Sequence, residues 1–229
     1  MRELPILFSG AMVRAILDGR KTQTRRVVKL NVTGRAQRGK RQWHIDDPDA
    51  VLACPYGQPG DRLWVRETWR GIVDINPPDE PLEFSVARYV PEQKYCRRVE
   101  YLATHERDGK PWRPSLHMPR WASRILLEIT GVRVERMQQI TDDDAIAEGA
   151  IRTDWGLPAG RSSETWHMGD ATGPEACMMS PRLAFANLIN KLHGGPRWNL
   201  KGPNWVDEPQ GLWEQNPWVW VVSVKRVTA

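Results

Sequence analysis

The chain has 229 residues and a mass of 26.3 kDa, which fits one domain with insertions and a core large enough to fold without disulfides. Hydrophobic residues make up 40% and charged residues 27%, so the composition is that of a globular protein and not of a disordered one. The longest apolar run, Trp218–Val222, is too short for a transmembrane helix, so no membrane partner is expected.

Cysteines, histidines and the first residues bear on cofactors and location. The three cysteines and five histidines are scattered, without a CxxC, HxxxH or HExxH pair. We therefore expect no metal site and no cofactor. The first ten residues contain too short an apolar stretch for a signal peptide, so the cytoplasm is the expected location.

Positive charge is concentrated near the start of the chain. Ten lysines and arginines and one acid, Asp18, lie between Arg14 and Arg41, so this segment carries +9 while the whole chain carries +5. Such a field attracts a polyanion, and nucleic acid is the natural candidate; a solvated basic loop is the alternative. The twelve tryptophans fit either interpretation, since indole rings stack on nucleobases or pack over loops poor in other apolar residues.

The first half of the chain predicts one helix and two strands. Residues 11–18 have the apolar spacing of a helix, with Ser9 as its N-cap and Gly19 at its end. Residues 21–30 are typical of a strand, and 30–50 of a polar, basic loop or insertion. Residues 59–69 predict a turn and a strand with Leu63 and Val65 on one face, and 70–114 an irregular region with one possible hairpin.

The second half predicts two helices between two strands. Residues 125–134 alternate as a long strand, and 141–150 predict a short helix that Thr141 and Asp144 cap and Gly149 ends. A polar insertion at 152–179 precedes a helix over 180–195, and 218–227 predicts a closing strand. Strands separated by irregular segments, with few short helices, indicate an α+β fold built on a small mixed β-barrel of five or six strands.

One motif carries a family resemblance. The segment 16–26, ILDGRKTQTRR, contains the pattern G-x-K-x-x-x-R at Gly19, Lys21 and Arg25, and PGDRLWVRETW follows at 59–69. In these residues the chain resembles the ASCH family of the PUA-like superfamily, whose domains are associated with RNA and modified bases. As a whole it is similar to the ASCH-containing proteins of tailed phages and prophages.

The resemblance implies a fold and a domain organisation. It covers about 6–30, 58–69, 115–150 and the final strand. It implies a single ASCH-like domain over 1–229, a PUA-like mixed barrel with flanking helices, and large insertions at about 30–57, 70–114 and 151–217.

The resemblance also implies a catalytic group. The G-R-K-T-x-T motif of the family's N4-acetylcytidine amidohydrolases matches Gly19 to Thr24, which assigns Lys21 and Thr24, and a short gapped match assigns Glu148. Elementary chemistry adds conditions: a threonine nucleophile needs a base, and lysine serves only if its pKa falls. Neighbouring Arg20, Arg25 and Arg26 favour that fall, whereas Glu148 opposes it.

Geometry and other residues leave alternatives open. In a regular strand Lys21 and Thr24 point to opposite faces, so they converge only if Lys21 lies in the turn after Gly19 or at a bulge. Lys21 and Arg25 can equally be phosphate contacts, and Thr24 and Glu148 ordinary strand and helix residues. The remaining candidates for binding nucleic acid or substrate are Arg20, Arg25, Arg26, Glu67, Trp69 and His117. A buried pair of Glu67 with an arginine, and a structural His117, are the alternatives.

Two functions compete. One is a metal-independent amidohydrolase that acts on an N4-acylated cytidine through Lys21, Thr24 and Glu148. The other is a non-catalytic PUA-like module that binds RNA or a modified base. Ribonuclease activity also occurs among ASCH domains, but no histidine pair is placed for it, and composition neither favours nor excludes a structural role in a phage.

Overall fold

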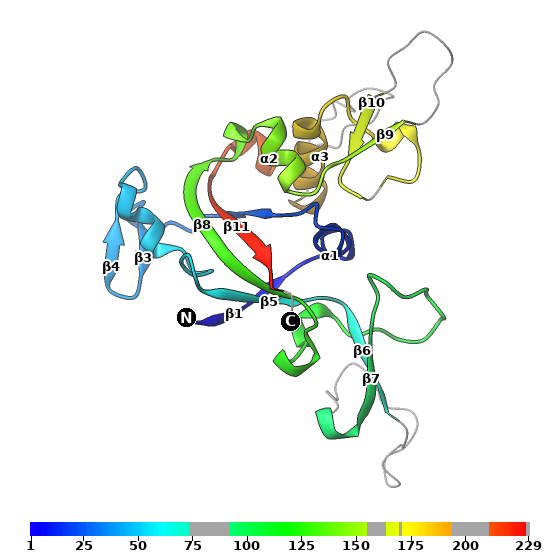
Figure 1. The fold of residues 1–229 in the computed structure, drawn as a ribbon. Coiled ribbons are helices and arrows are strands. Elements are labelled where there is room, and N and C mark those ends of the chain that lie inside the picture. Colours follow the sequence, from blue (N-terminus) through cyan, green and yellow to red (C-terminus); the bar gives the residue numbers. More distant parts are fainter. Residues whose placement is uncertain (74–91, 155–163, 170, 194–210, 228–229) are drawn as a thin grey trace.

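The centre of the molecule is one five-stranded sheet. The computed structural model describes residues 1–73, 92–154, 164–169, 171–193 and 211–227 (Figure 1). The sheet has the order β1-β5-β8-β11-β2, with β1 parallel to β5 and the other neighbours antiparallel. Its strands are β1 (Glu3–Leu7), β2 (Gln23–Val27), β5 (Arg62–Arg66), β8 (Leu126–Arg136) and β11 (Trp218–Arg226). The predicted α+β class and the strands at 59–69, 125–134 and 218–227 are confirmed.

The sheet is curved but is not a closed barrel. A bulge between Ser223 and Val224 shifts the register of β11 against β8, so that Thr130 is skipped, and bulges bend the strands that carry them (Figure 1). In the described residues no hydrogen-bonded ladder joins the two edges, β1 and β2. Instead Arg26 of β2 donates from Nη2 to the Leu7 carbonyl of β1 at 2.7 Å. A side chain therefore spans the gap that a barrel would close with backbone pairing.

The predicted helices and their caps are present. The Ser9 hydroxyl accepts from the Met12 amide at the start of α1 (Gly10–Leu17), and Gly19 reverses the chain after it with φ +74°. Thr141 and Asp144 form the predicted capping box of α2 (Asp142–Ala147). Ser180 caps α3 (Pro181–His193), and a short α4 (Leu212–Gln215) precedes β11.

Among the described residues, three hairpins lie outside the central sheet. They are β3 (Ala36–Arg38) with β4 (Arg41–Trp43), β6 (Trp69–Val73) with β7 (Cys96–Tyr101), and β9 (Ile151–Asp154) with β10 (Glu164–His167). One of them, β6–β7, is the possible hairpin predicted within 70–114. Of the predicted loop or insertion at 30–50, the loop was wrong, because a two-residue turn with Gly39 at φ +61° pairs Arg38 with Arg41. The 3₁₀ helices are Pro48–Ala53, Gln93–Tyr95, Ser115–His117, Arg120–Ala122, Met137–Gln139 and Pro174–Ala176.

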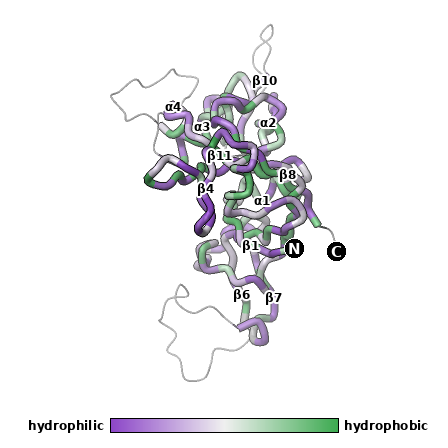
Figure 2. The backbone as a smooth tube through the Cα atoms, turned by 90° about the vertical axis from the view of Figure 1, so that its left-hand side faces the viewer, coloured by the Kyte–Doolittle hydropathy of each residue, from purple (hydrophilic) through white to green (hydrophobic). Residues whose placement is uncertain are grey.

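The sheet separates two apolar clusters. Trp220, Val222 and Val224 of β11 face the larger cluster, and Val219 and Val221 face a smaller one against α2 and α3. This alternation buries residues on both faces of β11, whereas hydrophilic colour marks the chain near β4 (Figure 2). Among the described residues no helix is long and apolar enough to cross a membrane.

Asp61 is expected to stabilise the β1–β5 pair in a pH-dependent way. Its carboxylate accepts from the Arg2 guanidinium and from the Arg2 and Gln58 amides, and the Arg2 contact lowers its pKa to about 2. Because the unfolded pKa is about 3.9, this contribution is complete above about pH 4 and is lost as pH falls through about 2. At pH 7 Asp61→Asn should unfold at a lower urea concentration than the wild type. Its urea midpoint should also change less than that of the wild type when the pH is lowered, and urea titrations at several pH values measure both effects.

The control for this prediction is Asp46→Asn, which removes an exposed carboxylate beside His44. Its unfolding curves should follow those of the wild type. Equal unfolding of Asp61→Asn and wild type at pH 7 would contradict the prediction.

Candidate functional site

Lys21 and Glu148 are brought together by two adjacent turns. After α1 the amides of Arg20 and Lys21 both donate to the Ala15 carbonyl, so Lys21 lies in the turn that precedes β2. Glu148 is the C-cap of α2, and Gly149 follows it with φ +108°. The Thr22 amide donates to the Ala147 carbonyl at 2.8 Å, which fixes one turn against the other.

The Lys21 ammonium group is fully satisfied by these surroundings. Its Nζ donates to Glu148 Oε2 at 2.6 Å, to the Glu148 carbonyl at 2.9 Å and to the Gln23 carbonyl at 2.8 Å. An ammonium has three N–H donors, so each one has an acceptor. The two side chains are only 1% and 3% exposed. The pair is therefore closed to solvent as well as saturated.

The pKa of Lys21 is lowered by burial and by two neighbouring arginines and is raised by Glu148. Burial is the largest influence and lowers the Lys21 pKa, and Arg26 and Arg25 lower it further. The Glu148 carboxylate raises it, but the pKa remains below its ordinary value. Of the influences expected from the sequence, those of Arg25, Arg26 and Glu148 are present and that of Arg20 is not, whereas burial, the largest, was not foreseen.

The pair belongs to a larger buried network of charges. Arg25, whose side chain is fully buried, contacts Glu148 at 3.4 Å, Asp144 at 3.0 Å and Glu135 at a short distance. Arg133 donates to Glu135 at 3.1 Å and to Asp144 at 2.9 Å. Burial raises the pKa of Asp144, but Arg25 and Arg133 together hold it below its usual range. We call the six residues Lys21, Arg25, Arg133, Glu135, Asp144 and Glu148 the charge network.

Thr24 lies on the other face of β2. It pairs with Val222, whose side chain belongs to the larger cluster, whereas Gln23 and Arg25 face the charge network. Thr24 is buried, and the hydrogen bonds among the described residues include none to its hydroxyl. The structure thus brings together two of the three predicted catalytic residues, with Lys21 in the turn as the parity argument required.

Arg20 and Arg26, which lie near Lys21 in the sequence, make hydrogen bonds within the protein. Arg20 donates to Asp18 at 2.8 Å and to the Gly149 carbonyl at 3.1 Å. The Arg26 guanidinium lies over the Phe8 ring and donates to the Leu7 carbonyl. Both therefore support the turn and the sheet edge around Lys21.

The other three candidates lie outside this network. Glu67 is buried, and its carboxylate is held by Arg124 through two hydrogen bonds of 2.9 and 3.0 Å, which is the supporting pair considered as an alternative. Trp69 is fully buried and packs edge-on against Trp121, so its faces are closed to a ligand. His117 is exposed, and no contact of the described residues links it to Lys21 or Glu148.

Some members of the charge network could not be identified from the sequence. Asp144 was recognised only as a capping residue, Arg133 lay within the strand predicted over 125–134, and Glu135 lay just beyond its end. Arg133 and Glu135 alternate with Val132 and Val134. This alternation was the available signal, because it marks a polar face on a strand inside the sheet.

A small cavity adjoins the Lys21–Glu148 pair. It has a volume of about 210 Å³ and lies between α1, α3 and the end of α2. Its lining, which includes Met12, Ala15, Met168 and Leu188 beside Glu148, is mainly apolar. No group of His, Cys, Asp and Glu in the described part of the chain could hold a metal ion.

Comparisons with known proteins add no relative: neither protein-family models, nor curated proteins, nor solved structures match this chain.

Loss of one member of the Lys21–Glu148 pair should be strongly destabilising. Lys21→Met leaves a buried carboxylate facing Arg25 alone, and Glu148→Gln leaves a buried ammonium; each should cost about 3–5 kcal/mol. The double variant Lys21→Met/Glu148→Gln should cost less than the sum of the two. Urea denaturation of all three variants measures this coupling.

Lys225→Met is the matched control, because its ion pair with Glu128 is largely exposed. It should cost no more than about 1 kcal/mol. Additive costs of Lys21→Met and Glu148→Gln would contradict the proposed interdependence.

Gly149→Ala should also disturb the site without changing any charge. A Cβ at this position would lie 3.0 Å from the Ala15 Cβ, and the φ of +108° strains any other residue. The expected loss is about 1–3 kcal/mol in thermal unfolding. Gly34→Ala, at φ +72° with open space around it, isolates the cost of the backbone conformation, and an equal loss in both variants would rule out a role for the Ala15 contact.

Proposed function

We propose that this chain is an ASCH-type, PUA-like protein of the cytoplasm that binds RNA or a modified nucleobase as a single domain with insertions. The family resemblance at Gly19, Lys21 and Arg25 supports the assignment. It is also supported by the curved α+β sheet and by the contact between Lys21 and Glu148.

The observation that carries the proposal is that the cations in the first part of the basic segment are mostly used inside the protein and those in the second part are not. Arg20, Lys21 and Arg25 are paired with carboxylates, so they contribute little to the outer field. None of the five cations from Lys29 to Arg41 makes an ion pair with a described residue: Lys29, Arg35, Arg38, Lys40 and Arg41. We call these five residues the hairpin cations, because they lie on and beside the β3–β4 hairpin.

The hairpin cations have the chemistry of a phosphate-binding surface. Four of them are exposed and Arg38 is half-buried, and no acid occurs between Leu30 and His44 to neutralise them. Lysine and arginine side chains bind phosphates by displacing condensed counterions, which gives affinity independent of base sequence. Their clustering on one hairpin favours a nucleic-acid strand over an isolated anion.

Binding should depend strongly on salt. For a single-stranded RNA, the logarithm of affinity should fall linearly with the logarithm of salt concentration, with a slope of about −0.7 per phosphate contact. Lys40→Ala/Arg41→Ala should weaken binding and reduce the slope by about 1.4. Fluorescence anisotropy of a labelled oligonucleotide at several salt concentrations measures both quantities.

Arg107→Ala/Lys110→Ala removes the same charge from exposed residues that follow β7 and serves as the control. It should leave the slope unchanged. An RNA affinity that does not change with salt concentration, or equal effects of the two double variants, would exclude the hairpin as the binding surface.

A second candidate function is hydrolysis of an N4-acylated cytidine. The lowered pKa of Lys21 favours it, because a deprotonated lysine amine can accept a proton from a threonine hydroxyl, whereas the ion pair with Glu148 favours the ammonium form. Attack by Thr24 would give an acyl-threonine and release cytidine, which takes up that proton, and water would then release the acid. The placement of Thr24 on the opposite face of β2 ranks this function second.

The hydrolase hypothesis predicts release of cytidine and acetate from N4-acetylcytidine, detected by chromatography. Thr24→Val keeps the shape of the buried side chain but removes the hydroxyl, so it should abolish turnover while the protein stays folded. No turnover by folded wild-type protein would sink the hydrolase hypothesis, and RNA binding would stand alone.

A further inference from the structure

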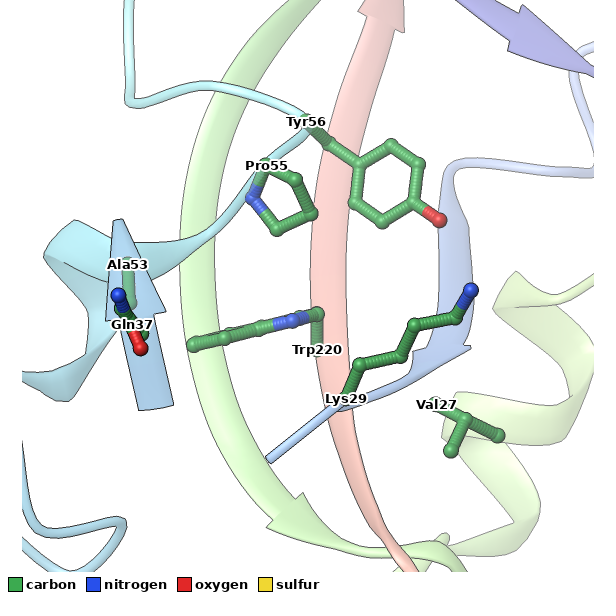
Figure 3. A pocket seen from close by; sticks show the side chains of 7 residues that line it. All are labelled: Val27, Lys29, Gln37, Ala53, Pro55, Tyr56 and Trp220. Atoms are coloured by element: carbon green, nitrogen blue, oxygen red, sulfur yellow. The ribbon is translucent and has the colours of Figure 1, made fainter. Parts of the chain in front are cut away.

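A pocket of about 350 Å³ opens beside the hairpin cations, and of its lining residues only Lys29 belongs to them. It lies where the end of β2, strand β3 and the segment after the 3₁₀ helix Pro48–Ala53 meet β11 (Figure 3). Its volume is at the small end of the range of about 300–1,000 Å³ for sites that bind small organic groups. The side chains that form it include Lys29, Gln37, Pro55, Tyr56 and Trp220.

The aromatic walls are held rigidly. Trp220 is only 3% exposed and belongs to the larger apolar cluster, and its strand is paired on both sides by β2 and β8. Tyr56 is half-buried and packs against the same cluster. In Figure 3 the indole of Trp220 is seen edge-on and the Tyr56 ring face-on, with Pro55 beside it. A flat ring entering the pocket would stack on the half-buried Tyr56 ring and meet the small exposed part of Trp220, both favourable contacts.

The polar side chains are placed to orient such a ring. The Gln37 amide donates to the Gly39 carbonyl at 2.8 Å and accepts from Asn31 at 3.0 Å, so its orientation is fixed while one donor and one acceptor position remain. Burial raises the pKa of Tyr56, so its hydroxyl stays protonated at neutral pH. Lys29 is exposed and makes no ion pair with a described residue.

We propose that this pocket takes one unstacked base of a single-stranded nucleic acid, with Tyr56 and Trp220 against the base, Gln37 at its edge and the flanking phosphates on Lys29 and the hairpin cations. The inference rests on the proposed function, because the hairpin cations supply the phosphate contacts. It adds a base-binding site built largely from the 30–57 insertion, whose lining includes neither Lys21 nor Glu148.

The test compares a uridine decamer with a decamer of the same length that contains only abasic ribose phosphates, at one fixed salt concentration. Stacking of a base on aromatic side chains should make the wild type bind the base-bearing strand about 5- to 100-fold tighter. Tyr56→Ala should remove most of this preference, and Tyr56→Phe should keep it. Gln37→Ala, at an exposed position, should reduce it without affecting folding.

The outcomes separate this inference from the proposed function. Lys40→Ala/Arg41→Ala should weaken both strands by the same factor, since it removes phosphate contacts only. Equal affinity of wild type for the two strands, or a preference that survives both Tyr56→Ala and Gln37→Ala, would overturn the base pocket while salt-dependent binding remained. Absence of binding to either strand would overturn both. A deoxyuridine decamer and uridine 5′-monophosphate as competitor distinguish RNA from DNA and a strand from a free nucleotide.

Discussion

The structure depends on burying two cations, Lys21 and Arg25, against three carboxylates between an edge strand and a short helix. Removing a charge from water costs several kcal/mol unless a partner and hydrogen bonds replace the solvent. β2 places Arg25 in the interior, and its side chain can remain there only because α2 supplies Asp144 and Glu148 and β8 supplies Glu135. The turn after α1, the edge of the sheet and the end of α2 are therefore interdependent, and neither β2 nor α2 has an apolar face large enough to fix its position alone.

Local signals were sufficient for most of the fold. Caps located α1, α2 and α3, alternating apolar residues located β8, and a continuous apolar run located β11, since these features act within a few residues. The β3–β4 hairpin was missed because its strands are three residues long and mostly polar, so no periodicity could develop. The barrel expected from the sequence is not closed. Alternation predicts strands but not which strands are neighbours, and here the Arg26 side chain, not a backbone ladder, links the edge strands β1 and β2.

The site was predictable only where one short segment carried its chemistry. The motif from Gly19 to Arg25 located Lys21, and the match to Glu148 agrees with their contact of 2.6 Å. Partners from distant strands could not be inferred, because Arg133 and Glu135 are remote from Lys21 in the sequence and have no motif. Glu67 shows the reverse case: parity placed it inside the protein, and burial then required the arginine that the structure supplies as Arg124.

The basic segment from Arg14 to Arg41 has two environments, because the carboxylates of the charge network pair only with cations in its first part. Asp144 and Glu148 on α2 and Glu135 on β8 lie opposite Lys21 and Arg25, so the charge network is neutral and contributes little at a distance. After Val27 the chain leaves the sheet, and the cations that follow project from a hairpin that carries no acids. Positive charge that is a folding element before residue 27 thus becomes surface charge after it. That change of environment, more than the net charge of the chain, is the basis for proposing polyanion contacts at the hairpin and at the aromatic pocket beside it.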